Sequence, residues 1–460
     1  MSKPYTYIAS GAIIAGVIVV TAAVSPWLLP DYELNNQMTA EEAAAITQEM
    51  INTKCADCHK PGMEVPQLLN TLSGGLLQRD VTNGLRSFNI DDEITEVTIA
   101  KLEHVLNTNS MPPTAFTMVH WGSFMTPREK VAMGKWTANM RKHFYPSSFA
   151  CPDFVNEAIQ PIPDNLPVNP AKVALGEKLF HDVRLSNDNT VSCATCHALD
   201  KAGTDNLATS TGVKGQKGGI NAPTVFNAAF HHRQFWDGRA KDLQEQAGGP
   251  PLNPVEMGYS HESDWKEISA KLEADPTLAA EFKAVYPDGF NAKNITEAIA
   301  EFEKTLITPN SPFDRYLKGD ANAISDNAKK GYALFKKNGC QMCHVGVAMG
   351  GLSFEAADRR GDFFGGRALT GDDNGRMNFT KDKADQFKFR VPTLRNVALT
   401  WPYLHDASAK TLSEAVDKML VTQCGVKDPK KQDIDLIVDF LETLTGNYQG
   451  APVKGEPAKR

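Results

Sequence analysis

The sequence contains no run rich in lysine and arginine, and no repeat array or disordered tract dominates it. Proteins bind nucleic acids by neutralising phosphates with clustered basic side chains. The missing basic run and the formal net charge of -7 therefore argue against nucleic acid as a partner. No segment has the pattern of a parallel β-sheet, which predicts a mainly α-helical fold. The chain of 460 residues is 42% hydrophobic and long enough for two to four globular domains.

Six of the eight cysteines occur in three Cys-x-x-Cys-His motifs. In such a motif two thiols add to the vinyl groups of a haem, and the adjacent histidine ligates the iron. A zinc half-site or a redox Cys-x-x-Cys motif requires no histidine at this place, so neither explains three repetitions. The sequence therefore predicts three covalently bound haem c groups. The attachment cysteines are Cys55, Cys58, Cys193, Cys196, Cys340 and Cys343, and the proximal histidines are His59, His197 and His344.

Residues 7–29 are apolar almost throughout, and Lys3 is the only charged residue before them. A run of this length can cross the hydrocarbon core of a bilayer as a helix. A cleaved signal peptide is the alternative, although its apolar core is usually shorter. We expect a transmembrane anchor over residues 1–30 that crosses a bacterial inner membrane once. Either alternative exports the chain, and covalent haem attachment is consistent with haem domains in the periplasm, on the outer side of that membrane.

The expected architecture is three c-type cytochrome domains in tandem behind the transmembrane helix. Six prolines between Tyr145 and Pro170 interrupt the helical pattern and predict a stiff, extended linker. In the helix expected over 294–307, Glu301, Glu303 and Lys304 are interpreted as a solvated face. The predicted segments are a monohaem domain over 31–145, a linker over 146–169, haem domains over 170–315 and 316–450, and a tail over 451–460.

The second axial ligand of the first haem is predicted to be Met111. This methionine precedes two prolines in a turn-prone stretch, and small c-type cytochromes commonly use a methionine in such a loop. Met118, Met125 and His120 are the alternatives. With both axial positions occupied, this haem passes electrons and has no open position for a substrate. Outside the haem motifs, Cys151 and Cys424 are interpreted as small buried residues, with a disulfide as the alternative.

The stretch after the second haem motif is rich in polar groups that an electron carrier does not need. It supplies Trp236, Gln246 and Glu256 between glycines and prolines. Such groups suit chemistry at an open iron face. Together with the haem motifs, this stretch resembles the bacterial di-haem cytochrome c peroxidase family, specifically its longer trihaem, membrane-anchored quinol-peroxidase branch. The resemblance covers 170–446 through the motifs Leu175-Gly-Glu-Lys-Leu-Phe180, Asn221-Ala-Pro-Thr224, Phe235-Trp-Asp-Gly-Arg239, Pro254-Val-Glu-Met257, Ser311-Pro-Phe-Asp314, Val391-Pro-Thr-Leu-Arg-Asn396 and Pro402-Tyr-Leu-His-Asp406.

The resemblance implies a peroxidase that reduces hydrogen peroxide to water with electrons from a membrane quinol or a small periplasmic donor. It implies that the haem at His197 is peroxidatic, with Glu256 and Gln246 in its distal pocket. A positioned carboxylate can take a proton from one peroxide oxygen and give it to the other. Arg239 is either a charge stabiliser or half of a structural salt bridge. Trp236 is implied as the electron path between the two core haems.

For the other core haem, the resemblance implies electron transfer at His344 with Met419 as the distal ligand. Asn221, with the backbone carbonyls of Thr400 and Pro402, matches the family's interhaem calcium site. Ligation by oxygen atoms alone suits a hard cation such as Ca²⁺. The other functions considered are a multihaem electron-transfer module without peroxide chemistry and a protein-oxidising maturation enzyme.

One loop departs from the family pattern. Many relatives carry a histidine in the glycine-rich loop before the Asn-Ala-Pro-Thr motif, where it blocks the peroxidatic iron until the other haem is reduced. Val213 stands at this place, and valine cannot ligate iron. His231 and His232 are alternative ligands, although a surface or supporting role is the simpler interpretation. The iron at His197 is therefore expected to be open in the oxidised enzyme.

Overall fold

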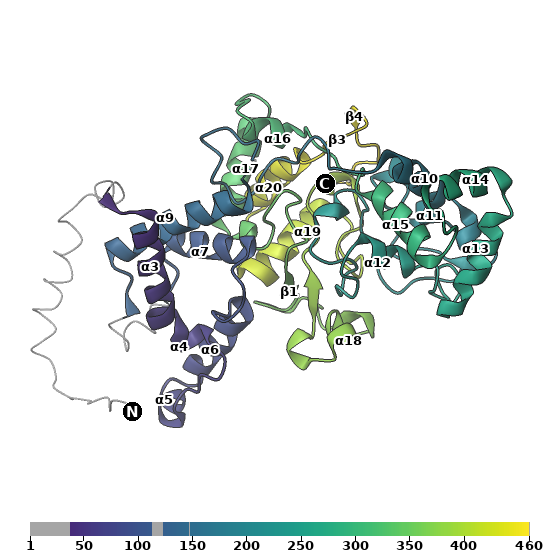
Figure 1. Cartoon of the computed structure of the whole chain (residues 1–460). Coiled ribbons are helices and arrows are strands. Elements are labelled where there is room, and N and C mark those ends of the chain that lie inside the picture. Colours follow the sequence, from purple (N-terminus) through teal and green to yellow (C-terminus); the bar gives the residue numbers. More distant parts are fainter. Residues whose placement is uncertain (1–36, 113–122, 147, 460) are drawn as a thin grey trace, which may run out of the picture. The chain divides into compact units, whose positions relative to one another are not determined.

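The computed structural model describes residues 37–112, 123–146 and 148–459. The chain divides into two compact units, Met1–Phe144 and Tyr145–Arg460. As predicted, the fold is mainly helical (Figure 1). Over the described ranges, no helix combines the length and the apolar character that a membrane span requires. The anchor predicted over residues 1–30 lies outside the described residues.

The first unit is built from helices around the first haem motif. Thr39 caps the first of them, since its hydroxyl accepts the backbone N–H of Glu42. A π-helical turn then delivers Cys55, which packs against Met50 and Leu102. The helices are α3 (Ala40–Met50), η2 (Ile51–Cys55), α4 (Ala56–His59), α5 (Gln67–Leu72), α6 (Leu76–Ser87), α7 (Glu96–Thr108) and α9 (Pro127–Phe144).

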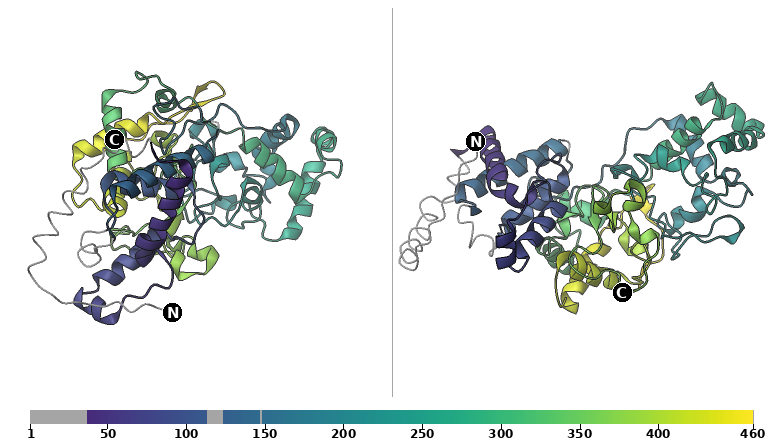
Figure 2. Two further views of the ribbon diagram at one scale, coloured as in Figure 1. Left: turned by 60° about the vertical axis from the view of Figure 1, so that its left-hand side comes forward. Right: turned by 90° about the horizontal axis from the view of Figure 1, so that it is seen from below.

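The second unit contains two helix pairs that each carry a hydrophobic core. In the first pair, α10 (Pro170–Phe180) packs against α15 (Ala292–Glu303), and in the second, α17 (Asp326–Lys337) packs against α20 (Lys431–Glu442). Figure 2 shows the two helix pairs from two further directions. A glycine allows each close approach: a Cβ at Gly176 would lie 1.9 Å from the Ala298 carbonyl oxygen, and one at Gly331 would lie 1.9 Å from that of Leu436.

Shorter elements complete the second unit. The α-helices are α11 (Cys193–Cys196), α12 (Leu243–Gly248), α13 (Trp265–Glu273), α14 (Pro276–Val285), α16 (Pro312–Leu317), α18 (Met377–Thr380) and α19 (Leu412–Met419). The 3-10 turns are η4 (Val183–Leu185), η5 (Leu199–Lys201), η6 (Val213–Gly215), η7 (Ala228–Phe230), η8 (Glu262–Asp264), η9 (Cys340–Met342), η10 (Asp372–Asn374), η11 (Lys383–Asp385) and η12 (Val397–Leu399), and η13 (Leu420–Cys424) is a π-turn. Two antiparallel strand pairs are present: β1 (Phe354–Ala356) with β2 (Lys388–Arg390), and β3 (Asn447–Tyr448) with β4 (Ala451–Pro452).

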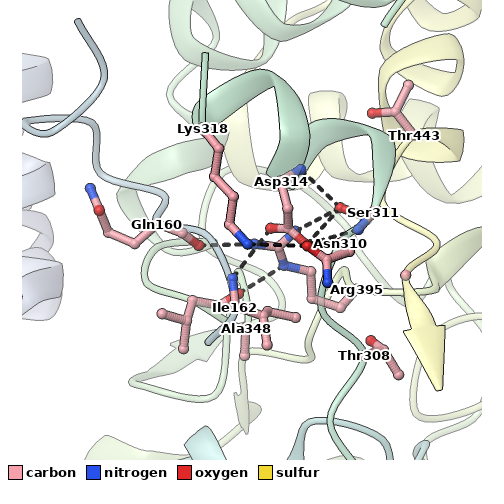
Figure 3. A network of polar contacts seen from close by, with 12 residues as sticks. Gln160, Ile162, Thr308, Asn310, Ser311, Asp314, Lys318, Ala348, Arg395 and Thr443 are labelled. Atoms are coloured by element: carbon pink, nitrogen blue, oxygen red, sulfur yellow. Dashed lines mark hydrogen bonds and ion pairs between the residues drawn. The ribbon is translucent and has the colours of Figure 1, made fainter. Parts of the chain in front are cut away.

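The proline-rich segment 146–169 belongs to the second unit and differs from a free linker. Ile159 and Ile162 are completely buried. The carbonyl oxygen of Gln160 accepts a hydrogen bond from Arg395 (2.9 Å), which also pairs with Asp314 at 2.9 Å (Figure 3). The prolines suppress helix formation, while the two isoleucines and the backbone carbonyls bind the segment to the core. The unit boundary therefore lies at the start of this segment.

The predicted tail also packs against the core. Val453 joins the hydrophobic core of the first helix pair, and the carbonyl oxygen of Lys454 accepts the backbone N–H of Ala202 (2.7 Å). The Trp401 indole N–H donates to the carbonyl oxygen of Glu456 (3.1 Å). The segment 451–460 thus contacts residues from both halves of the second unit.

Candidate functional site

Each predicted haem histidine forms a hydrogen bond between its ring Nδ1 and a backbone carbonyl. An Nδ1–H that donates fixes the tautomer in which Nε2 carries a lone pair, and such outer contacts orient histidines that ligate metals. The same arrangement recurs at all three Cys-x-x-Cys-His motifs. The pairs are His59 with Phe88 (2.8 Å), His197 with Gly203 (3.3 Å) and His344 with Met349 (3.0 Å).

The six attachment cysteines are partly buried, and none forms a disulfide. Two thiols and one oriented imidazole are the groups that a haem c requires, and the three motifs therefore fit this cofactor. Cys151 and Cys424 form no disulfide, and the Cys424 sulfur lies 4.0 Å from that of Cys340.

A largely apolar cavity of about 240 Å³ surrounds the third haem motif. Cys340, Cys343 and His344 contribute to its lining, and so does Met419 at the end of α19. The soft thioether of Met419 suits a haem iron, and the structure brings this predicted ligand to the same cavity as its proximal histidine. Met349 is completely buried nearby, but its backbone carbonyl holds His344.

Trp236 reaches the same cavity from the other half of the second unit. Its indole N–H donates to the carbonyl oxygen of Asn221 (2.8 Å), and its ring meets Phe389 and His405 edge to face, with centroids 6.2 and 6.4 Å away. A partly buried Trp with its N–H satisfied is held in one orientation. The tryptophan predicted as the electron path is thus fixed beside the His344 cavity.

The three residues predicted to bind calcium also line this cavity. Asn221 is 8% exposed, its side-chain amide nitrogen donates to the Leu207 carbonyl oxygen (2.8 Å), and its side-chain oxygen remains as an acceptor. Thr400 and Pro402 contribute from the segment that follows η12. Oxygen atoms of this kind fit a hard cation, and the calcium site stays a prediction.

A second group near the cavity could be mistaken for a metal site. Ligand atoms of Asp373, His405 and Asp406 lie within 4.8 Å of one another. The Arg367 guanidinium already contacts Asp373 at 2.6 Å and Asp406 at 2.8 Å, and these contacts hold the pKa of Asp373 well below its usual range. The positive charge of Arg367 thus already compensates both carboxylates, and we interpret the group as an ion-pair network.

Glu256 is a half-buried carboxyl on the loop after α12. Its Oε1 accepts a hydrogen bond from the side chain of Asn253 (2.7 Å). Burial raises its pKa, and this effect exceeds the opposing effects of the Arg239 charge and the Asn253 hydrogen bond. The next residue, Met257, belongs to the hydrophobic cluster against which Cys193 also packs, and this places the loop near the second haem motif. A carboxyl with a raised pKa is suited to both accept and donate a proton.

The neighbouring polar residues predicted for this site differ in their surroundings. The Arg239 guanidinium lies 3.5 Å from the Phe235 ring centroid and 3.1 Å from a carboxylate oxygen of Asp237, and its side chain is 47% exposed. A structural salt bridge is thus present, and the positive charge of Arg239 also lowers the pKa of Glu256. Gln246 is half-buried on α12.

The loop that contains Val213 packs directly on the Glu256 segment. The Val213 backbone N–H donates to the Glu256 carbonyl oxygen (2.9 Å), and Val213 is 1% exposed. A Cβ at Gly212 would lie 1.9 Å from the Val255 carbonyl oxygen, so this position requires glycine. His232 is exposed, whereas His231 is buried and lines the His344 cavity.

The distal side of the first haem is described only in part. Met111, the predicted ligand, is 38% exposed and lies immediately before the residues that the structure does not describe. Met118 and His120 lie outside the described residues. Met125 packs against the cluster that includes Cys55. Met111 stays the prediction, and the position of Met125 makes it the alternative to test.

Two buried ionisable groups were missed by the sequence prediction. Glu303, expected on a solvated face, is 5% exposed, and one of its carboxyl oxygens has no hydrogen-bond partner among the described residues. Burial raises its pKa to about 8. Arg390 is 3% exposed and donates to Nδ1 of His231 at 3.0 Å. The helical pattern gave the wrong face for Glu303, and no pattern connects two residues as distant in sequence as His231 and Arg390.

The comparisons with known proteins agree with this geometry. A model of the di-haem cytochrome c peroxidase family matches residues 170–322, and a haem-binding domain model matches residues 17–139. The chain is 44% identical over 451 residues to the cytochrome c peroxidase Ccp of Escherichia coli (strain K12), covering 95% of this chain and 96% of that protein. It is 46% identical over 293 residues to the cytochrome c551 peroxidase of Nitrosomonas europaea, covering 64% of this chain and 85% of that protein.

Among solved structures, a MauG-like protein associated with microbial copper homeostasis shares 30% identity and a TM-score of 0.55, covering 62% of this chain and 92% of that structure. The fold and the oriented histidine motifs thus define a haem-binding protein of the c type. The chain belongs to the di-haem cytochrome c peroxidase family. The predicted enzyme class, a haem peroxidase, is confirmed, and so is haem binding in the N-terminal region.

Proposed function

We propose that this protein reduces hydrogen peroxide to water on the periplasmic side of a bacterial inner membrane, with electrons from a quinol or a small cytochrome relayed through three haem c groups. Three motifs with the same histidine–carbonyl contact support three haems. The apolar run over residues 7–29 supports an anchor, and the anchor favours a membrane quinol as donor. The Escherichia coli peroxidase matches 95% of this chain and 96% of its own length.

The proposal depends above all on Glu256. Reduction of one peroxide consumes two electrons and two protons and yields two water molecules. A haem held by Cys193, Cys196 and His197 would supply the redox-active iron for this reaction. Glu256, with its raised pKa, takes the proton from one oxygen and returns a proton to the oxygen that leaves as water. Asn253 holds the carboxyl in place, and Arg239 supplies a neighbouring positive charge.

The His344 half is suited to deliver electrons. Its cavity is lined by His344 and Met419, which would ligate a haem iron, and Trp236 is held at its edge by a hydrogen bond to Asn221. A fully ligated haem changes its oxidation state with little rearrangement and has no open position for peroxide. Ca²⁺ held by Asn221, Thr400 and Pro402 would join the two halves at this point.

The test is turnover of the purified holoprotein with peroxide and a reduced donor. Glu256→Gln is expected to lower turnover by ~10²-fold or more, because an acid–base group is lost while the shape is kept. Glu262→Gln, at an exposed site on η8, serves as the matched control and is expected to retain turnover. Unchanged turnover in Glu256→Gln would remove this residue from the mechanism.

Two further measurements test how many haem irons are open to peroxide and which electron donor the enzyme uses. A protein without peroxide chemistry would show three six-coordinate haems, whereas the proposal expects one high-spin ferric haem. Turnover driven by a quinol analogue is compared with turnover driven by a reduced cytochrome. Faster turnover with the quinol analogue supports a membrane quinol as the donor. Turnover with the reduced cytochrome alone would instead identify a cytochrome as the donor.

A further inference from the structure

Arg390 is a buried cation without an anionic partner in the part of the chain that the structure describes. Its side chain donates to the carbonyl oxygen of Phe235 (3.1 Å) and to Nδ1 of His231 (3.0 Å), and both acceptors are neutral. Burial lowers the pKa of Arg390 to about 10. A guanidinium remains protonated at neutral pH even so, and a buried charge is costly unless an opposite charge compensates it.

Among the residues that the structure describes, the other two arginines that are buried as deeply have carboxylate partners. Arg395 pairs with Asp314 at 2.9 Å, as Figure 3 shows, and Arg141 pairs with Glu103 at 2.7 Å. The side chains of Arg395 and Arg141 are completely buried, and Arg390 is 3% exposed. The fold therefore compensates a buried guanidinium where it can, and Arg390 is the exception among these three.

The surroundings of Arg390 indicate where the missing anion belongs. Arg390 and His231 both line the cavity that contains Cys340, Cys343 and His344. Nδ1 of His231 accepts from Arg390, so its proton is on Nε2, and this buried atom has no hydrogen-bond partner within the described residues. An unpartnered imidazole N–H and a guanidinium charge without a described anionic partner thus belong to one cavity. A haem carries two propionate carboxylates, and a planar guanidinium is well matched to a carboxylate.

We propose that the Arg390 guanidinium binds a propionate of the haem attached at Cys340 and Cys343, and that His231 positions this guanidinium. The inference rests on the proposed function only in requiring a haem at this motif. Gly351 supports the arrangement, because a Cβ there would lie 2.2 Å from the His231 ring. By compensating the propionate charge, Arg390 favours the ferrous haem, and it thereby helps to set the reduction potential of the electron-transferring centre.

The test is a spectroscopic redox titration of the fully haem-loaded protein, without peroxide. In Arg390→Gln, the ferric-to-ferrous ratio of the haem at His344 is expected to rise about tenfold at a fixed ambient potential, because the propionate charge is no longer offset. The haem at His197 should change less. Arg390→Lys keeps the charge and should recover most of the original potential. His231→Asn should shift the same haem in the same direction by a smaller amount.

Arg359→Gln is the matched control, since Arg359 lines the same cavity but lies 4.0 Å from the Glu355 carboxylate. A smaller shift than in Arg390→Gln supports the proposal. An unchanged potential in Arg390→Gln, an equal shift in Arg359→Gln, or no recovery in Arg390→Lys would overturn it. If Arg390→Gln does not load haem, Arg390→Lys and His231→Asn decide the matter. Absence of haem from Cys340 and Cys343 in the unmodified protein would instead refute the proposed three-haem function.

Discussion

The two halves of the second unit follow one plan and differ on the side where peroxide would react. Each half has a glycine at its helix crossing and a histidine bound to a backbone carbonyl. Each also has a Pro-Thr pair, followed by an asparagine with a left-handed backbone, at Asn227 (φ 64°) and Asn396 (φ 63°). A narrow hairpin comes next, bridged at Gln234–Ala240 in one half and at Tyr403–Ala409 in the other.

The halves separate after these hairpins. In the second half α19 continues to Met419, which lines the cavity of its own haem motif. In the first half α12 ends at Gly248, and the following loop carries Glu256 beside Val213. One scaffold thus holds both haem motifs, and under the proposed function the segment after the hairpin would supply a soft sixth ligand in one half and a carboxyl beside an open iron in the other.

Removal of the methionine should give the second half an open iron and produce the largest effect. Met419→Ala is expected to add a second high-spin ferric signal and to lower turnover by about 10²-fold or more, because loss of a thioether ligand lowers the potential of the electron-transferring haem. Electron paramagnetic resonance and steady-state turnover measure the two effects. Met377→Leu, at another methionine of this half, should change neither. A single high-spin signal in Met419→Ala would show that Met419 is not a ligand.

The reciprocal change, a ligand added to the first half, should block the haem iron at His197. Val213→His adds a ligand on the loop that packs against Glu256. The oxidised protein should lose its high-spin signal, and its competent fraction should fall about tenfold or more until the other haem is reduced. Stopped-flow mixing with peroxide should then show a lag that pre-reduction removes. An open iron and full oxidised-state activity in this variant would show that the loop does not reach the haem.

The shared glycines test whether the two halves are equally dependent on close helix packing. Gly176→Ala and Gly331→Ala should each lower the free energy of unfolding by about 1–3 kcal/mol, since each new Cβ would meet a backbone carbonyl that cannot move freely. Thermal unfolding of the two variants measures the loss. Gly218→Ala, where the nearest atom to a Cβ is 3.8 Å away, should have almost no effect. A loss in one half only would show that the other crossing can relax.

The sequence predicted what covalent and local chemistry determines. The haem cysteines and histidines follow from the spacing that covalent attachment requires. The packing of the segment 146–169 could not be predicted, because two isoleucines are a weak signal among many prolines. The Arg390–His231 contact could not be predicted either, since only tertiary folding brings these residues together.

The smallest expected effect is that of removing the positive charge of Arg239 near Glu256. Arg239 lowers the pKa of Glu256 against the larger effect of burial. Glu256 must be ionised to accept a proton from peroxide, so activity is lost as the pH falls through its pKa. Arg239→Gln removes the positive charge and raises this pKa further, and the acid limb of kcat/KM should therefore move to higher pH.

The shift in Arg239→Gln should be less than about one pH unit, because the Arg239 side chain is 47% exposed and solvent screens its charge. High salt should shrink the difference between the variant and the original enzyme, and Lys241→Gln, at an exposed site nearby, should leave the profile in place. An acid limb that moves to lower pH would contradict the electrostatic role. An unchanged limb together with lower thermal stability would leave Arg239 only its salt bridge to Asp237, and the open face would then depend on burial alone to raise the pKa of Glu256.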